Sequence, residues 1–259
     1  MDQYVADVVT TEQIDLWLAF QDEIEDVLLL REYASLLSES ERARGARFHF
    51  DLHRRQHLIT RALIRTVLSG YCDVSPRDWR FATNDYGRPN VTAPDVLGGL
   101  SFNLAHTDGL IVCACATSSI VGVDVERVRI DKAPLDIADR YFSRAEVAEL
   151  RALPREEQPA RFFQYWTLKE SYIKATGKGL STPLDQFSFL LERPGHIELL
   201  FHAGLNDDPR RWQSWLFEPA PGYLVALTVQ RGPQQIVARK AVPLRSALAL
   251  ECRVIAKSA

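Results

Sequence analysis

The sequence predicts an α+β fold made of two similar lobes in tandem, each a small, mainly antiparallel sheet packed against helices. The main observation is one order of elements that occurs twice along the 259 residues: helical segments, then short strands around glycine-containing turns. The chain is also long enough to bury a core in each half. We place the lobe boundary so that residues 1–119 form the N-terminal lobe and residues 120–259 the C-terminal lobe.

Composition places the chain among ordinary globular proteins. Hydrophobic residues make up 46% and charged residues 25%, and the formal charge of −3 gives no overall electrostatic reason to bind nucleic acid or an anionic membrane. The first residues lack a signal peptide, and the longest uncharged run, residues 109–123, is shorter than the roughly 20 residues that span a bilayer. Four scattered cysteines do not suit a disulfide framework. We therefore expect a cytoplasmic protein.

Both lobes begin their helices with the same signal. Residues 38–41 (SESE) and 143–146 (SRAE) have the Ser-x-x-Glu form of a capping box. Longer helical stretches follow at residues 53–71 and 161–179, and each ends at or near a glycine that can act as C-cap. Domains without a duplication can also show this order of elements, so that alternative stays open at this point.

Strands are expected after each long helix. The segments WRFATN and FSFLLE come first, and LSFNLAHTDGLIVCACA and RWQSWLFEPAPGYLVALTV follow them. Each of the last two predicts a pair of strands around a turn with glycine. The tail after Val229 receives no assignment beyond a strand or a short helix.

Two acids lie on the strand expected at the lobe junction. Valines alternate there with Gly122, Asp124 and Glu126, so the two carboxylates project from one side, about 7 Å apart. The two carboxylates repel each other unless they are solvated, paired with a basic side chain or bridged by a cation. With a third acid nearby, the pair suits Mg²⁺. Taken alone, it is more often a solvated strand face.

The helix WTLKESYIKATGKGL, residues 166–180, offers that third acid. Glu170 and Lys174 lie one turn apart, and Trp166, one turn before Glu170, is expected to shield them. Taken alone, the two charged residues suggest a surface ion pair worth about 0.3–0.5 kcal/mol. The phosphate-loop motif and the dinucleotide glycine motif are both missing from the sequence. A conventional nucleotide-binding fold is therefore disfavoured.

The first lobe carries basic side chains suited to phosphate, because arginine directs two donors at once toward an oxyanion. The candidates are Arg44, Arg47, Arg55, Arg88 and His106. Each arginine alone is explained as well by a solvated surface, and His106 by a structural hydrogen bond. Together with the three acids, they would suit a metal-dependent phosphoryl-type transfer on an anionic substrate.

In their order along the chain, FNLAHT, GVDVE, FSRAE and WTLKESYIKATGKGL resemble the motifs of the Sfp-type 4′-phosphopantetheinyl transferases, from about Ser38 to Phe189. The two-lobed pseudo-dimer of that family matches the repeat. The resemblance implies a monomer that transfers the phosphopantetheine arm of coenzyme A to a serine of an apo acyl or peptidyl carrier protein and releases 3′,5′-ADP. Such carriers serve fatty-acid, polyketide or nonribosomal-peptide biosynthesis.

The resemblance also implies residue roles in the second lobe. Asp124, Glu126 and Glu170 would hold Mg²⁺ against the pyrophosphate, and Glu170 would act as general base, directly or through a water. Lys174 would stabilise or protonate the leaving phosphate, and Lys169 would contact the phosphates.

In the first lobe the resemblance implies coenzyme A binding, with Arg44 on the 3′-phosphate and Arg88 and His106 nearby. Two positions depart from the family pattern. Ala105 stands where serine is usual, and the lost hydroxyl could weaken coenzyme A binding by about 1 kcal/mol. Glu41 stands where a basic residue is common, so the phosphate contacts would depend more on the arginines at positions 44, 47 and 55.

Two other functions use the same features. One is a metal-dependent hydrolase of coenzyme A or nucleotide pyrophosphates, which would release free phosphopantetheine. The other is a catalytically dead module that binds carrier proteins, whose effect would survive the change Glu170→Ala.

Overall fold

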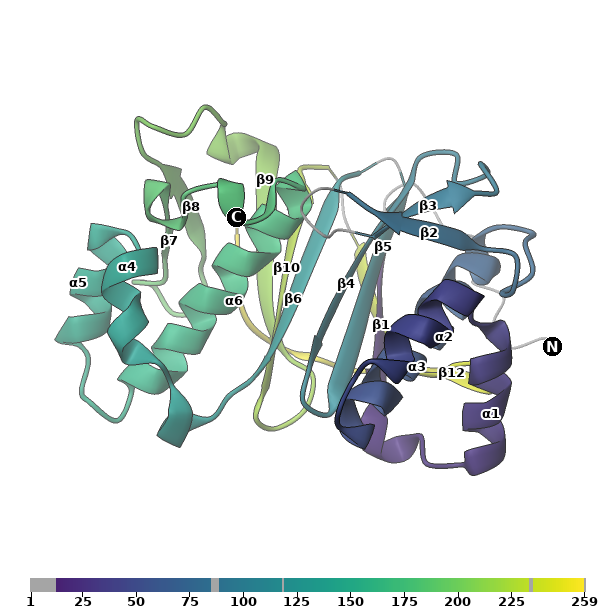
Figure 1. The fold of residues 1–259 in the computed structure, drawn as a ribbon. Helices are drawn as coiled ribbons and strands as arrows, with labels where there is room; N and C mark the ends of the chain where they lie inside the picture. Colours follow the sequence, from purple (N-terminus) through teal and green to yellow (C-terminus); the bar gives the residue numbers. More distant parts are fainter. Residues whose placement is uncertain (1–12, 85–88, 118, 233–234, 259) are drawn as a thin grey trace. The chain divides into compact units, whose positions relative to one another are not determined.

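The computed structural model describes residues 13–84, 89–117, 119–232 and 235–258, and these form two compact units (Figure 1). The first unit takes the described residues of Met1–Ser118 and Gln234–Leu250, and the second those of Ser119–Pro233 and Glu251–Ala259. The two-segment division predicted from the sequence therefore differs from the structure at residues 234–250. The physical reason is strand pairing, since the strand beginning at Gln235 joins the sheet of the first unit.

The sheet of the first unit has the strand order β12-β11-β1-β5-β4. Its strands are β1 (Gln13–Phe20), β4 (Leu100–Thr107), β5 (Leu110–Thr117), β11 (Gln235–Val242) and β12 (Ser246–Ala249). All neighbours are antiparallel except β1 and β11, which run parallel. A two-stranded sheet of β2 (Arg80–Thr83) and β3 (Pro89–Ala93) lies apart from it.

The helices of the first unit are η1 (Gln21–Glu23), α1 (Val27–Leu36), α2 (Glu39–Ala46) and α3 (Asp51–Tyr71). The long helix α3 packs on β1 and β5. Its apolar side chains Ile59, Leu63 and Val67 are completely or almost completely buried in the core of this unit. Burial of this face, spaced at three or four residues, holds the helix on the sheet.

The sheet of the second unit has the order β13-β9-β10-β6, all antiparallel. Its strands are β6 (Val121–Arg127), β9 (Trp212–Glu218), β10 (Tyr223–Gln230) and β13 (Arg253–Lys257). The helices are α4 (Ala138–Tyr141), α5 (Arg144–Ala152) and α6 (Gln158–Thr176), with a separate pair β7 (Phe187–Leu190) and β8 (Glu198–Phe201). Short 3₁₀ helices complete the unit: η2 (Ile130–Lys132), η3 (Leu135–Ile137), η4 (Gly179–Ser181), η5 (Leu184–Gln186) and η6 (Pro209–Arg211).

The two units repeat one plan. Each begins with a strand, continues through helices that end with the longest one, and then adds two strand pairs. The order β1-β5-β4 in the first sheet corresponds to β6-β10-β9 in the second. The predicted α+β fold of two similar lobes is confirmed. Beyond the shared plan, β11 and β12 extend the first sheet next to β1, whereas β13 extends the second next to β9.

Both predicted capping boxes are present. In α2 the backbone N–H of Glu41 donates to the Ser38 hydroxyl, and Ser38 N–H donates to the Glu41 carboxylate at 2.8 Å. In α5 the same exchange joins Ser143 and Glu146, again with a 2.8 Å bond to the carboxylate. Each box satisfies N–H groups that a helix start leaves unpaired.

Each capping glutamate also holds a buried cation from the long helix of its unit. Glu41 bonds Arg65 of α3 at 2.5 Å, and Glu146 bonds Lys169 of α6 at 2.8 Å. The side chains of Arg65, Lys169 and Glu146 are fully buried. The two units therefore also share a buried ion pair between the capping glutamate and the long helix. Throughout the described residues, every helix is too short or too polar to cross a membrane.

Candidate active site

The site begins with a close approach of α6 to β6, which lie side by side in the second unit (Figure 1). A Cβ atom on Gly122 would lie 2.2 Å from the backbone oxygen of Ser171 and 2.2 Å from the backbone nitrogen of Ala175. Only glycine fits between these backbones. The contact places Lys174 of α6 beside Asp124 of β6.

A buried chain of hydroxyls fixes the same turn of α6 to the sheet. The hydroxyl of Ser171 bonds that of Thr228 on β10 at 2.7 Å, and Thr228 bonds Ser214 on β9 at 2.9 Å. All three residues are buried. The turn that carries Glu170 is therefore held by side-chain bonds as well as by backbone packing.

Lys174 forms its ion pair across the two elements rather than with Glu170 along the helix. Its ammonium donates to Asp124 Oδ1 at 2.6 Å. Burial works against the charged ammonium, but Asp124, Glu170 and Glu126 outweigh it and raise the pKa of Lys174. Asp124 is 5% exposed, and its second oxygen, Oδ2, has no hydrogen-bond partner among the described residues.

The other two carboxylates have raised pKa values. Burial and the neighbouring charge of Asp124 raise the pKa of Glu126 to about 7 and that of Glu170 to about 7, although Lys174 opposes both shifts. The indole of Trp166 also opposes the raised pKa of Glu126. Both glutamates therefore change protonation near neutral pH, as suits proton transfer at that pH.

Trp166 has a second role that the sequence did not indicate. Its ring stacks on Phe162 at a centroid distance of 6.1 Å and meets Tyr141 edge-on at 5.9 Å. These aromatic contacts hold the indole that influences the pKa of Glu126. The position one turn before Glu170 was the available signal, but it predicted only shielding.

The donor set suits a hard divalent cation. Asp124, Glu126 and Glu170 offer only oxygen, and Asp124 Oδ2 is buried without a hydrogen-bond partner among the described residues. Burial, followed by the charge of Asp124, raises the pKa of both glutamates, and a bound cation would relieve that repulsion. Within the described parts of the chain, no three carboxylate, imidazole or thiol side chains form a complete metal-binding group. Mg²⁺ does not require one, because it keeps waters and shares substrate phosphates. The residues fit Mg²⁺ in their chemistry.

Lys169 does not belong to this group, and the prediction that it contacts phosphates is wrong. Its side chain is fully buried and pairs with Glu146 at 2.8 Å. It also donates to the backbone oxygens of Leu184 at 2.7 Å and Phe187 at 2.6 Å. These three bonds use all three ammonium hydrogens. Lys169 is a structural cation that joins α6 to α5 and to the start of β7.

The basic candidates of the first unit have different surroundings. Arg44 in the last turn of α2 and Arg47 at its C-cap are exposed, and His106 is exposed near the end of β4. Arg55 is partly buried on α3 and has Asp22 at 3.6 Å and Glu25 at 3.9 Å. Arg88 lies outside the described residues.

Two further basic residues join Arg44: His57, which ends the basic segment HRRQH at residues 53–57, and Arg61, which the sequence reasoning missed. Burial, followed by the charges of Arg61 and Arg44, lowers the pKa of His57, although a hydrogen bond to the backbone oxygen of Glu41 at 3.0 Å opposes the shift. His57, Arg61 and Arg65 are spaced by four residues, so they share one face of α3. That spacing was the signal that could have revealed them.

Glu41 also has a structural explanation. It is 9% exposed, closes the capping box of α2 and bonds Arg65. The acid at this position stabilises the interior through these contacts.

Comparison with known proteins defines the class. Residues 27–118 match the family described as 4′-phosphopantetheinyl transferase, N-terminal, and residues 120–228 match the 4′-phosphopantetheinyl transferase superfamily. The 4′-phosphopantetheinyl transferase Sfp of Bacillus subtilis is 34% identical over 75% of this chain and 83% of its own. The 4′-phosphopantetheinyl transferase HetI of Nostoc sp. is 36% identical over 66% of this chain and 71% of its own.

The chain belongs to the 4′-phosphopantetheinyl transferase family and is of the Sfp type. The resemblance stated from the motifs is confirmed, and so is the enzyme class.

Proposed function

We propose that this protein transfers the 4′-phosphopantetheine arm of coenzyme A to a serine of an apo acyl or peptidyl carrier protein, with Mg²⁺, and releases 3′,5′-ADP. The observation that carries the proposal is the group on β6 and α6. It combines a paired cation, Lys174, with three carboxylates, Asp124, Glu126 and Glu170, of which two titrate near pH 7. Membership of the transferase family supports the same reaction.

Glu170 is the proposed general base. With a pKa of about 7 it is ionised in a large share of molecules at neutral pH and can still accept a proton with useful driving force. It would take the proton of the carrier serine, directly or through a water.

Lys174 is the proposed stabiliser of the leaving phosphate. Its raised pKa keeps the ammonium charged, and Asp124 orients it at 2.6 Å. A fixed positive charge favours the negative charge that develops on the leaving group. When bound, Mg²⁺ would supply further neutralisation of the pyrophosphate, and Asp124, Glu126 and Glu170 are the residues that would hold it.

We also propose that the first unit mainly binds coenzyme A, whereas the second unit carries the metal and catalytic residues. Arg44 and Arg47 are exposed, which supports a role in phosphate binding. His57 and Arg61, electrostatic neighbours of Arg44, extend this basic group. Arg55, Arg88 and His106 remain proposed contacts. A cytoplasmic monomer remains a prediction, and size-exclusion chromatography with light scattering would test the monomer.

Intact-mass spectrometry tests the function. Apo carrier proteins of fatty-acid, polyketide and peptide synthesis are incubated with the protein, coenzyme A and Mg²⁺, with EDTA in a parallel sample. We expect a mass gain of one phosphopantetheine arm that EDTA abolishes. The variant Glu170→Gln should lose the gain, whereas Glu157→Gln should keep it. Glu157 is the matched control because it is exposed at the start of the same helix and makes no side-chain capping bond.

Two results would contradict the proposal. Free phosphopantetheine without a modified carrier would identify a hydrolase. No product on any carrier, together with retained carrier binding by Glu170→Gln, would identify a dead binding module.

A further inference from the structure

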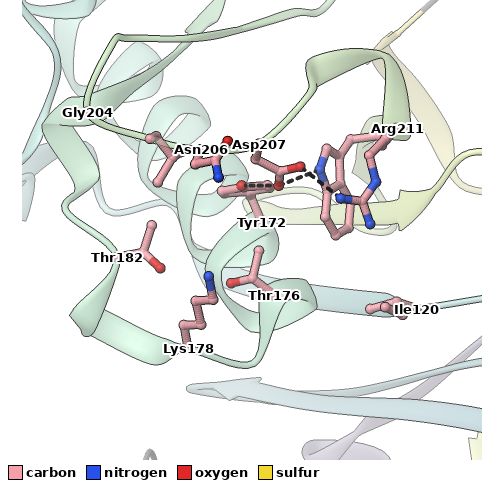
Figure 2. A pocket seen from close by; sticks show the side chains of 11 residues that line it. Ile120, Tyr172, Thr176, Lys178, Thr182, Gly204, Asn206, Asp207 and Arg211 are labelled. Carbon is pink, nitrogen blue, oxygen red and sulfur yellow. Dashed lines mark hydrogen bonds and ion pairs between the residues drawn. The ribbon is translucent and has the colours of Figure 1, made fainter.

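The second unit contains a cavity of about 470 Å³ at the C-terminal end of α6 (Figure 2). It is lined by α6, by the residues on either side of η4, by the segment from β8 to the start of β9, and by Ile120. This volume lies within the range of about 300–1,000 Å³ typical of small-molecule sites. The residues proposed for catalysis do not line it.

The cavity lies on another side of α6 from the proposed active site. Tyr172 and Thr176 line the cavity, whereas Glu170 and Lys174 face β6. Two residues of helix correspond to a rotation of about 200°, so the two pairs point in nearly opposite directions. A ligand in the cavity would therefore not occupy the positions proposed for catalysis.

The polar side chains of the wall surround one space. Figure 2 shows Lys178 extending into it, with Thr182 and Thr176 on its two sides and Asn206 across from its ammonium. None of the ion pairs among the described residues of this unit involves Lys178. The hydroxyl of Thr176 donates to the backbone oxygen of Ile173 at 2.9 Å and forms part of the wall. Lys178, Thr182 and Asn206 remain as donors toward the space.

Thr182 gives independent evidence for a ligand. The residue is 4% exposed, and its hydroxyl has no hydrogen-bond partner among the described residues. A buried hydroxyl without a partner is costly, because it has lost its bonds to water. Water does not reach this hydroxyl in the structure, so a turn of the Thr182 side chain about its Cα–Cβ bond would bring it to an acceptor atom held beside Lys178.

The acid in the wall is already neutralised. Asp207 accepts hydrogen bonds from the Tyr172 hydroxyl at 2.7 Å and the Trp212 indole at 2.9 Å, and it pairs with Arg211 at 3.3 Å (Figure 2). Its negative charge is therefore matched within the wall. Lys178 remains as the unbalanced charge, so the cavity favours an anion.

The arrangement of the donors favours phosphate. They approach from several sides, which suits the oxygens of a tetrahedral anion better than the two coplanar oxygens of a carboxylate. A phosphate group occupies the volume of a few waters, each about 30 Å³, and so would fill only part of the cavity. The rest of the wall includes the apolar surfaces of Leu205, Trp212 and Ile120.

We propose that this cavity binds a phosphate monoester of a small organic molecule. Lys178, Thr182 and Asn206 hold the phosphate, and the organic part lies against Leu205 and Trp212. The site goes beyond the proposed transferase reaction, because its binding residues are not those of the chemistry.

A titration followed by NMR of methyl-labelled threonine tests the proposal in the full chain. Inorganic phosphate and phenyl phosphate are added separately, with sodium chloride at matched ionic strength as control. We expect both to shift the Thr182 methyl signal saturably, and phenyl phosphate to reach half-saturation at about tenfold lower concentration because it also buries apolar surface. Chloride should leave the signal in place.

Two variants complete the test. Lys178→Met should weaken the binding of phenyl phosphate about tenfold or more, since it removes a charged hydrogen bond. Lys132→Met, a change of an exposed lysine outside the cavity, should bind like the parent. An unsaturable shift, an equal shift with chloride, or unchanged binding by Lys178→Met would overturn the proposal. Lys178→Met should still modify carrier proteins, so failure here is separable from failure of the transferase function.

Discussion

The change Gly122→Ala tests the contact on which the active site depends. The new Cβ would lie 2.2 Å from two backbone atoms of α6 and 2.7 Å from a third, whereas ordinary contacts begin near 3.4 Å. The helix must therefore move from β6 by about 1 Å, because backbone atoms cannot swing aside. Overpacking of this kind costs about 3 kcal/mol, which corresponds to a fall in Tm of roughly 6–12 °C.

The same displacement should reduce catalysis. It moves Glu170 and Lys174 relative to Asp124, and a misplacement of about 1 Å costs on the order of 10²-fold in rate. Differential scanning fluorimetry and the carrier-modification assay measure the two effects on one preparation.

Gly204→Ala is the matched control for this change. Its Cβ would meet only the end of the Gln186 side chain, at 2.6 Å, and that flexible group can turn away. We expect nearly unchanged Tm and activity for this control. If Gly122→Ala kept the parent's Tm within about 2 °C and its rate within twofold, the close approach of α6 and β6 would not be needed.

Two further outcomes concern buried charge. Because the pKa values of Glu126 and Glu170 rise from 4.5 to about 7, the stability that these two groups contribute is highest below pH 4.5 and is lost as pH rises through 7, by roughly 1–3 kcal/mol for each group. In EDTA, the Tm of Glu126→Gln relative to that of the parent should increase as the pH is raised from 5 to 8. Addition of Mg²⁺ to the parent should raise its Tm more at pH 8 than at pH 6. The opposite order would contradict both pKa shifts. Lys169→Met should lower the free energy of unfolding in urea by about 3–5 kcal/mol, because it leaves the buried acid Glu146 unpaired. The double variant Lys169→Met, Glu146→Gln should regain part of that loss. Parent-like stability with a higher KM for coenzyme A would restore Lys169 as a phosphate contact.

Local signals predicted much of the fold. Both capping boxes follow from four-residue patterns, and the hairpins β4–β5 and β9–β10 follow from alternating strands around a turn. The strand with Asp124 and Glu126 was also expected, because its valines alternate with polar residues. Such features depend on neighbours in the sequence, so one sequence is enough to show them.

Contacts between distant segments could not be predicted in this way. Lys169 sits in the same motif as Glu170, but its environment is set by Glu146 on α5 and by the start of β7. Gly122 alternates with the valines like Asp124 and Glu126, and no local sign shows that α6 would lie against it. The pairing of β11 with β1 likewise depends on complementary edges that no local pattern encodes.

The parallel pairing of β1 with β11 has a consequence during synthesis. Ribosomes add about 5–20 residues per second, so roughly 10–45 s separate the appearance of β1 from that of its partner. Throughout that interval the edge of β1 that later receives β11 stays open to any other extended chain. In the second sheet, the edge of β9 likewise stays unpaired until β13 has been synthesised. An edge that stays open for this long can pair with another extended chain, so synthesis is the stage at which this sheet is most exposed to aggregation.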